Sequence, residues 1–340
     1  MVRMTGLLFA AFVILSAALV FLSRLSSPRW LVYAADRDNG IADIFILDTA
    51  RRMMINLTET PETGEDTPSV SADGTQIAFS RTIPGAMQIC VQTLGAGERC
   101  FEPAGRWDSD PHWSPDGAQI VFTTPGQTNL AELVLLKPES GEEIRLAVGQ
   151  DNTTNPDWSP DGERIVAVNA SPLGSHIIVI QVLDGQITHL NEGVSGQHVF
   201  PVWSPDGRQI AYLHDGFRLA LMNADGTGTR FLTGEDEHAY FPSWSPDGRQ
   251  IVFQANPGGT DWELYIFDLA SGDVRAITDN RALDERPAWS PDGRQIAFRS
   301  DRNGDINLYL YDVAAGTTRQ VTDGLWFYHP PVWPGQGSHY

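Results

Sequence analysis

Carboxylates and histidines recur just ahead of an aromatic residue that returns every 41 to 45 residues along the chain. Counted back from each aromatic position, they are Glu65 and Asp66, Asp108 and Asp110, His198, His238, Asp284 and Glu285, and His329. Carboxylates and imidazoles that face one opening can bind a divalent metal ion or a cationic group on a partner. The plainer interpretation is that loops are polar because they meet water. No pair has the tight spacing of a metal motif, so we expect a general contact surface and predict no cofactor.

The aromatic residue belongs to a sequence motif, here called the repeat phrase, that occurs six times in the chain. The full copies are PHWSPDGAQIVF from Pro111, PDWSPDGERIVA from Pro156, PVWSPDGRQIAY from Pro201, PSWSPDGRQIVF from Pro242 and PAWSPDGRQIAF from Pro287. A weaker copy, PSVSADGTQIAF, begins at Pro68, and an incomplete one, PVWPG, contains Trp333. A fixed period of this length indicates a repeat architecture.

Each repeat has the pattern of four short strands. In the copy from Pro287, Ser290-Pro291-Asp292-Gly293 is a turn, because proline presets φ, aspartate accepts from its own backbone and glycine takes a positive φ. Apolar and β-branched runs on either side alternate with further turns. Four strands joined by hairpins form an antiparallel sheet with open edges, and a radial arrangement of such sheets protects those edges. The sequence therefore predicts an all-β propeller.

The two ends of the chain together make one more blade. Residues 30–58 match the second, third and fourth strands of a repeat, and residues 330–333 match a first strand with nothing after it. Six whole repeats and this shared blade give a seven-bladed propeller over residues 25–340. A ring closed by strands from both ends has no remaining open edge.

Residues 1–24 differ in kind from the rest. Gly6 to Leu22 form an uncharged, apolar run that is about 26 Å long as a helix, enough to cross a bilayer core. A cleaved signal peptide is the alternative, but no small-x-small cleavage site follows the run. We expect a single-pass membrane anchor through residues 6–22, with the propeller outside the cytoplasm.

Charge and cysteines narrow the choice of partners and compartment. The net charge is −20 and the one lysine is Lys137, so we expect no nucleic-acid partner, because contact with phosphates needs a basic face. The two cysteines, Cys90 and Cys100, lie at mirror positions about Gly95 in a predicted hairpin. Facing positions of a hairpin bring two Cα atoms within disulfide reach. Two buried thiols are the alternative, but an export segment favours a disulfide.

The phrase PxWSPDGxxIAF resembles the WD40-like β-propeller repeat of TolB-type proteins, over residues 30–333. It is also similar to the propellers attached to prolyl-oligopeptidase-type peptidases. The TolB resemblance implies an envelope protein whose propeller binds other proteins. We expect no TolB-type α/β domain, since Leu25 to Trp30 leave no room for one before the propeller. The signature residues are structural, so no functional residue is transferred.

The motifs of catalysis are missing from the sequence. It contains no GxSxG, GxxxxGK[ST], HExxH or CxxC. We therefore expect a binding scaffold rather than an enzyme. The alternative is a lyase-type or lactonase-type propeller with a metal at the channel mouth, for which His198, His238 and His329 would have to converge on one ion.

The two faces of the predicted ring differ in variety. One face has the SPDG turns, which are nearly the same in every blade. The other has the loops that enter the first strands, and these differ between blades. Because binding residues tend to lie on varied loops of a rigid scaffold, we expect a protein partner at this second face, the channel mouth.

Overall fold

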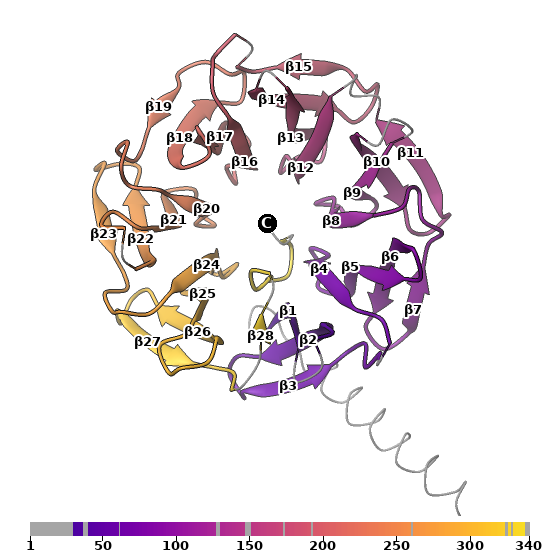
Figure 1. The fold of residues 1–340 in the computed structure, drawn as a ribbon, viewed down its shortest axis with the longest axis horizontal. Helices are drawn as coiled ribbons and strands as arrows, with labels where there is room; N and C mark the ends of the chain where they lie inside the picture. The colour runs from indigo at the N-terminus through magenta and orange to yellow at the C-terminus, as the bar shows by residue number, and fades with distance from the viewer. Residues whose placement is uncertain are drawn as a thin grey trace, which may run out of the picture.

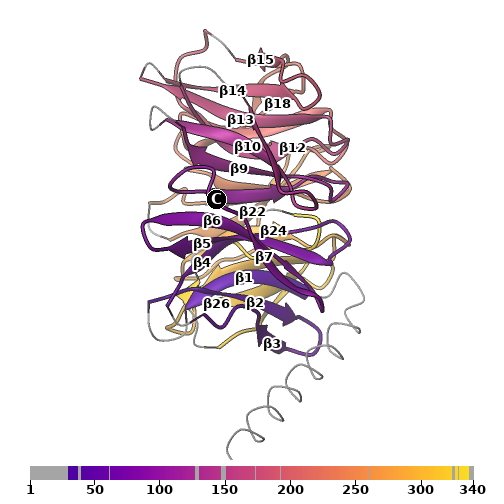
Figure 2. The same ribbon diagram turned by 90° about the vertical axis from the view of Figure 1, so that its right-hand side faces the viewer.

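Seven four-stranded antiparallel sheets surround a central axis in the computed structural model (Figure 1). The structure describes residues 30–36, 40–60, 62–126, 130–146, 151–172, 174–191, 193–259, 261–323, 326–327 and 329–336. Seen from the side, the sheets form a thick ring with two faces (Figure 2). The predicted seven-bladed propeller is confirmed.

The blades are numbered along the chain, each from its innermost to its outermost strand. Blade 1 is β28 (Trp326–Phe327), β1 (Trp30–Asp36), β2 (Asp43–Asp48) and β3 (Met53–Asn56); blade 2 is β4 (Glu65–Val70), β5 (Gln76–Ile83), β6 (Ala86–Thr93) and β7 (Gly97–Cys100). Blade 3 is β8 (Ser109–Trp113), β9 (Ile120–Pro125), β10 (Ala131–Lys137) and β11 (Glu142–Leu146); blade 4 is β12 (Asn152–Trp158), β13 (Arg164–Ser171), β14 (Gly174–Gln181) and β15 (Ile187–His189). Blade 5 is β16 (His198–Trp203), β17 (Gln209–His214), β18 (Arg218–Asn223) and β19 (Arg230–Phe231); blade 6 is β20 (Tyr240–Trp244), β21 (Gln250–Ala255), β22 (Glu263–Asp268) and β23 (Val274–Ala276). Blade 7 is β24 (Asp284–Trp289), β25 (Gln295–Ser300), β26 (Asn307–Asp312) and β27 (Thr317–Gln320).

Blade 1 closes the ring with strands from both ends of the chain. The Val32 and Val332 amides each donate to the other's carbonyl at 2.8 Å. Pairing also reaches further back than residue 330, because β28 pairs with the far end of β1. Pro330 and Pro331 lie between the two stretches, and a residue without an N–H cannot continue the ladder.

The SPDG turns form the network that the sequence predicts. In blade 6, the Ser245 hydroxyl accepts from the Gln250 amide at 2.9 Å and donates to the Asp247 carboxylate at 2.7 Å. That carboxylate also accepts the Arg249 amide at 3.1 Å. Gly248 has a φ of 68°, which a residue without a Cβ adopts freely. Turn chemistry therefore explains why this motif repeats.

The repeated tryptophans connect neighbouring blades. Trp158 of blade 4 packs with Leu133 and Leu135 of blade 3 in one buried cluster. Its indole N–H donates to the His112 carbonyl of blade 3 at 3.0 Å. Apolar area joins neighbouring blades in this way, and the indole N–H groups of Trp158, Trp244 and Trp333 each add a hydrogen bond to a carbonyl of the neighbouring blade.

The expected membrane anchor, residues 6–22, lies outside the described residues. No helix within the described residues is long and apolar enough to cross a membrane.

Candidate functional site at the channel mouth

Six innermost strands share a strained backbone position. In blades 2 to 7 the residue directly before the repeat's proline has a left-handed φ: Thr67 (47°), Asp110 (53°), Asn155 (55°), Phe200 (54°), Phe241 (52°) and Arg286 (54°). The strand pairing shifts there in each of these blades, which marks a β-bulge. Non-glycine residues rarely adopt this φ, and a following proline normally favours extended backbone. Such strain costs of order 1–3 kcal/mol at each site, and bulges of this kind re-aim side chains.

We call these six residues the bulge ring, and three neighbouring members contact one another across blades 5 to 7. The rings of Phe200 and Phe241 have centroids 6.1 Å apart. The Arg286 guanidinium lies 4.4 Å from the centroid of the Phe241 ring, a cation–π contact. The Arg286 amide donates to the Gln254 side chain at 2.8 Å. These three members are half-buried, so they form an aromatic and basic arc that solvent still reaches.

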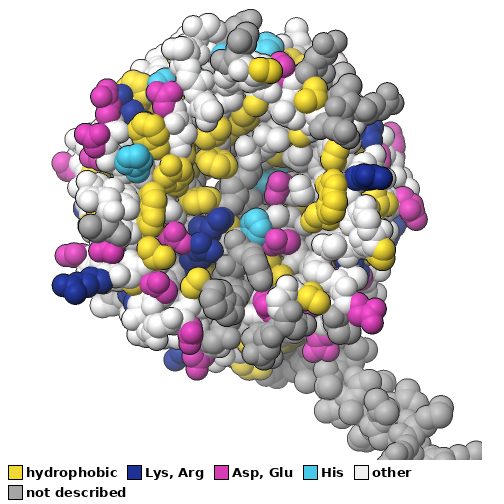
Figure 3. All heavy atoms as spheres, in the orientation of Figure 1, with side chains coloured by type: hydrophobic (Ala, Val, Ile, Leu, Met, Phe, Trp, Pro, Cys, Tyr) yellow, Lys and Arg dark blue, Asp and Glu magenta, His cyan; other side chains and the backbone are white. Residues whose placement is uncertain are grey.

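Acidic groups and a histidine also lie at the mouth. The His329 Nε2 lies 3.0 Å from an Asp66 carboxylate oxygen, which joins blade 2 to the closing segment. Burial raises the pKa of Asp110, and the nearby Asp66 carboxylate adds to that rise while His329 opposes it. Burial also lowers the pKa of Arg286 to about 10, with a further contribution from Arg299. Figure 3 shows histidine, acidic and basic side chains gathered around the central opening.

Four predicted site residues do not face the opening, and the expectation that they do is wrong. Glu65, Asp108, His198 and Asp284 are at most 1% exposed. All four lie five residues before the repeat's aromatic position. The innermost strands begin earlier than the sequence predicts, because pairing continues past the bulge, so most of these residues lie in strands rather than in loops.

The buried carboxylates have structural partners. Asp108 accepts the amides of Ala104 and Gly105 at 2.7 and 3.1 Å. Asp284 accepts from Arg302 at 2.8 Å and from the Asn280 side chain at 2.6 Å. A buried carboxylate needs such donors, so these contacts hold the blade edges in place.

The other predicted residues separate into two groups. Asp66, Asp110 and His329 lie together at the mouth, and Glu285 pairs there with Arg299 at 2.9 Å. His238 is exposed and stacks on Phe217, with centroids 4.9 Å apart. His198, His238 and His329 thus have different partners, and no group of three potential ligand side chains within the described residues includes any of them.

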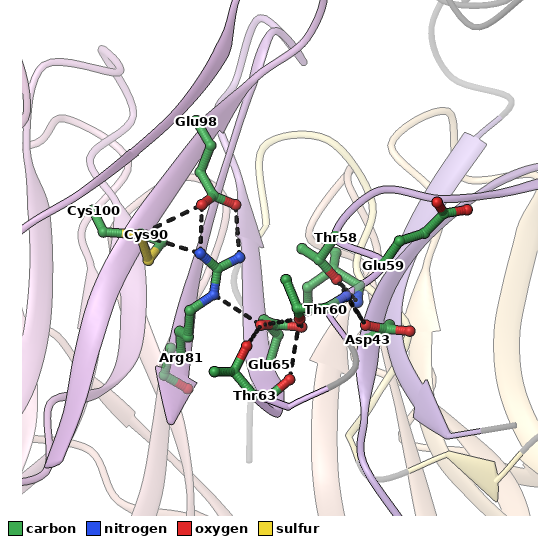
Figure 4. Close-up of polar contacts among 12 residues, drawn as sticks. Asp43, Thr58, Glu59, Thr60, Thr63, Glu65, Arg81, Cys90, Glu98 and Cys100 are labelled. Carbon is green, nitrogen blue, oxygen red and sulfur yellow. Dashed lines mark hydrogen bonds and ion pairs between the residues drawn. A yellow bond between two sulfur atoms is a disulfide. The ribbon is translucent and has the colours of Figure 1, made fainter. Parts of the chain in front are cut away.

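The group of potential ligands that the described residues do contain is Cys90, Glu98 and Cys100. The two sulfur atoms form a disulfide, and the cysteines face each other across β6 and β7. Arg81 lies beside them and reaches between Glu98 and Glu65, donating to the latter through Nε at 2.8 Å (Figure 4). The Arg81 guanidinium thus carries the positive charge in this cluster, in the place where a metal ion would otherwise carry it.

The mouth contains three residues that sequence reasoning missed: Phe200, Phe241 and Arg286. The missed signal is position, since each directly precedes a repeat proline, as Asp110 does. Phenylalanine and arginine at this position were not considered, because the candidate residues were carboxylates and histidines.

A pocket of about 420 Å³ opens at the opposite, SPDG end of the channel. It is lined by repeat residues, including Trp113, Trp158, Trp203 and Trp244. This pocket and the residues that differ between blades therefore lie at opposite ends of the channel. We place recognition at the mouth, because the same tryptophans already have a structural role between blades.

The fold and the mouth define a closed seven-bladed propeller with a blade-specific ring at one face. The model of the TolB beta propeller domain matches residues 66–261 and 201–339. The chain belongs to this family, as the repeat phrase predicts. No curated protein sequence matches the chain.

Solved structures confirm the fold. The propeller domain of the Trilobed protease from Pyrococcus furiosus has a TM-score of 0.69 at 16% identity, covering 88% of this chain and 96% of that one. An oligogalacturonate lyase in complex with manganese has a TM-score of 0.64 at 17% identity, covering 85% and 84%. A putative TolB from Agrobacterium tumefaciens has a TM-score of 0.55 at 20% identity, covering 79% and 96%. At these identities the likeness is one of fold alone.

Proposed function

We propose that this chain is a membrane-anchored, extracytoplasmic propeller that binds a protein partner at the channel mouth and has no catalysis of its own. One observation supports this above the others. Six blades repeat the same strained bulge, yet the side chains there are Thr, Asp, Asn, Phe, Phe and Arg. Strain retained at a position of varied chemistry is typical of a binding site.

The chemistry of the mouth suggests what it binds. Asp66 and Asp110 favour a cationic group, and the chain's net charge of −20 attracts one from a distance. Phe200 and Phe241 offer half-buried aromatic surface of the kind that dominates binding energy at protein interfaces. A basic segment with an apolar side chain fits this surface, because its cation can meet Asp66 and Asp110 and its apolar side chain can pack on Phe200 and Phe241. Its binding should weaken as salt rises.

Two features support the proposed location. Residues 6–22 are apolar enough for an anchor, and the Cys90–Cys100 disulfide suits an oxidising compartment. Fractionation with and without alkaline extraction tests the anchor. Recovery of the full chain in the soluble fraction would contradict it.

The metal-dependent enzyme is the less favoured function. One structural neighbour is a lyase that holds manganese, but His198, His238 and His329 have separate partners in this chain. We therefore retain binding as the proposed function.

Affinity capture from solubilised membranes, quantified by mass spectrometry, tests the proposal. The variant is Asp66→Asn/Asp110→Asn. The control, Glu139→Gln/Glu163→Gln, removes the same charge from exposed positions beside the opposite face. We expect the first variant to lose the partner and the control to keep it, with both variants folded as judged by circular dichroism. Equal recovery with both variants would contradict a site at the mouth.

A further inference from the structure

The polypeptide enters the propeller on the SPDG face. Trp30 begins β1, and its register partner is Asp48, the last residue of β2. The Asp48 carboxylate accepts the amides of Ala50 and Arg51 in the hairpin that follows, at 2.9 and 2.8 Å. The Trp30 ring lies beside the SADG turn of blade 2, because a Cβ at Gly74 would come within 3.0 Å of its Cζ2 atom. Strand β1 therefore starts at the SPDG face and runs towards the mouth.

The chain between the proposed anchor and this entry point is short. Residues 23–29 separate Leu22 from Trp30, and these seven residues reach at most about 25 Å when fully extended. A path from Trp30 to the mouth side has to cross β2 and β3 and then follow the length of the blade, about 30 Å in all. The linker is therefore long enough to place a bilayer at the SPDG face and too short to place one at the mouth.

Exposed arginines gather on the SPDG face in four consecutive blades that include the entry point (Figure 1). The position after the turn glycine is arginine in blades 5 to 7, whereas it is threonine, alanine or glutamate in blades 2 to 4. The three arginines are Arg208, Arg249 and Arg294, and all are exposed. Blade 1 adds Arg51 and Arg52 in the exposed β2–β3 hairpin. The SPDG face thus differs between blades at this one position, and its arginines lie on the side where the chain enters.

The seam between blades 7 and 1 brings two guanidiniums together. Arg319 of β27 donates to the Thr49 carbonyl in the β2–β3 hairpin at 2.8 Å, which links the two blades. Partial burial lowers the pKa of Arg319, and the positive charge of Arg52 lowers it further while Asp312 opposes the effect. Arg52 and Arg319 therefore lie near enough to repel each other. An anionic group at this seam would relieve that repulsion.

Aspartates also lie in these turns, but their own turns engage them. Asp292 accepts the Arg294 amide at 3.1 Å, and Asp312 accepts the amides of Ala314 and Ala315 at 3.1 and 2.8 Å. These carboxylates are directed at backbone donors, whereas the arginine side chains are longer and exposed. A guanidinium binds a phosphate through two parallel hydrogen bonds, so arginines on such a surface suit phosphate groups.

We propose that the SPDG face docks on the bilayer that the anchor spans, with arginines of blades 7 and 1 bound to the phosphates of anionic phospholipids. The short linker favours a headgroup as the ligand, because it holds this face at the membrane surface. The mouth then points away from the membrane, where a partner can reach it. This inference rests on the anchor in the proposed function.

Energy transfer in reconstituted vesicles tests the docking. The full-length protein is placed in vesicles of phosphatidylethanolamine and phosphatidylglycerol, with an acceptor dye on some headgroups. A donor dye is attached through an encoded azide side chain at Thr75 or at Pro84, the exposed residues directly before and after β5. The two ends of this strand are about 26 Å apart, so we expect strong transfer from Thr75 and weak transfer from Pro84.

Charge variants test the contact with phosphates. Arg52→Gln/Arg294→Gln should lower the ratio of docked to undocked propeller by about fivefold for each arginine, and raised salt should lower it in the parent. The matched control Arg106→Gln/Arg281→Gln removes the same charge from exposed residues in loops that enter first strands on the mouth side, and it should behave as the parent does. Circular dichroism of each variant shows that the fold is kept.

The outcomes separate the docking from the anchor. A chain that does not float with the vesicles would overturn the anchor and this inference with it. A chain that floats but shows equal or stronger transfer from Pro84 would overturn the docking and leave the anchor standing. Transfer from Thr75 that is unchanged in Arg52→Gln/Arg294→Gln would overturn the lipid phosphates as the ligand of this face.

Discussion

Val332 lies directly opposite Val32, and the two residues exchange both backbone hydrogen bonds at 2.8 Å. This pair joins the closing segment to the first strand of the chain. Directly beyond it, Gln336 accepts the Val70 amide at 3.0 Å and donates to the Trp289 carbonyl at 3.0 Å. Blades 1, 2 and 7 therefore meet at a few closing residues, which gives the seam a role in the stability of the whole ring.

Truncating the seam's tryptophan should destabilise the propeller. Trp333 is fully buried and its indole N–H donates to the Ala288 carbonyl at 3.2 Å. We expect Trp333→Ala to cost about 3–5 kcal/mol of unfolding free energy, measured by urea denaturation. Trp107 is 52% exposed, so Trp107→Ala should cost within about 0.5 kcal/mol. Equal costs for the two variants would show that the seam does not stabilise the ring.

Asp247 should stabilise its turn only while ionised. Hydrogen bonding from Ser245 lowers the pKa of Asp247 from 3.8, against the effect of partial burial. A lowered folded pKa adds stability above the unfolded value, and this stability is lost as the pH falls through the folded pKa. Asp247→Ala should therefore cost about 1 kcal/mol at pH 7. In denaturant titrations, its difference from the parent should shrink below about pH 3.8, and a difference that stays constant to pH 2 would be contrary to this account.

Asp110 should show the opposite behaviour. Burial raises its pKa above 3.8, so its ionisation costs stability as the pH rises through the folded value. We expect Asp110→Asn to raise the melting temperature at pH 7, and this gain to vanish below about pH 3.8. The same variant should bind the partner less well. A lower melting temperature at pH 7 would mean that the carboxylate is held for stability and not for binding.

Removing the disulfide should have a small effect. Cys90 and Cys100 are 10 residues apart in a hairpin that already fixes the loop. We expect Cys90→Ser/Cys100→Ser to cost about 1–3 kcal/mol, at the low end for a disulfide. Thiol labelling of exported protein under non-reducing conditions is the direct measurement. Two labelled thiols would argue against the bond in the cell.

The sequence was sufficient for the fold, because its period, turn residues and split terminal repeat each reflect local backbone chemistry. A proline and a glycine at the repeat positions of Pro291 and Gly293 favour the same turn in each copy. The number of blades therefore follows from counting the repeats and the shared terminal blade. It was less informative for the site. Glu65 and Asp66 are neighbours, yet one is buried against Arg81 and the other meets His329. That separation follows from tertiary pairing and not from residue type.

The contact between His198 and His214 could not be predicted for a related reason. The two residues belong to different repeat positions, and only the strand register places them opposite each other. The bulge ring also arises from register, since a shift at each proline turns one residue out of the ladder.

Site-specific photo-crosslinking in living cells tests the central claim most directly. A benzophenone side chain at Asn155 would lie in the bulge ring, where the equivalent positions in blades 5 and 6 already hold Phe200 and Phe241. The same group at Glu163, exposed beside the SPDG turn of the same blade, is the matched control. We predict a discrete crosslinked adduct from Asn155, weakened by Asp66→Asn, and none from Glu163. An adduct from Glu163 with none from Asn155 would place binding on the other face and contradict the account.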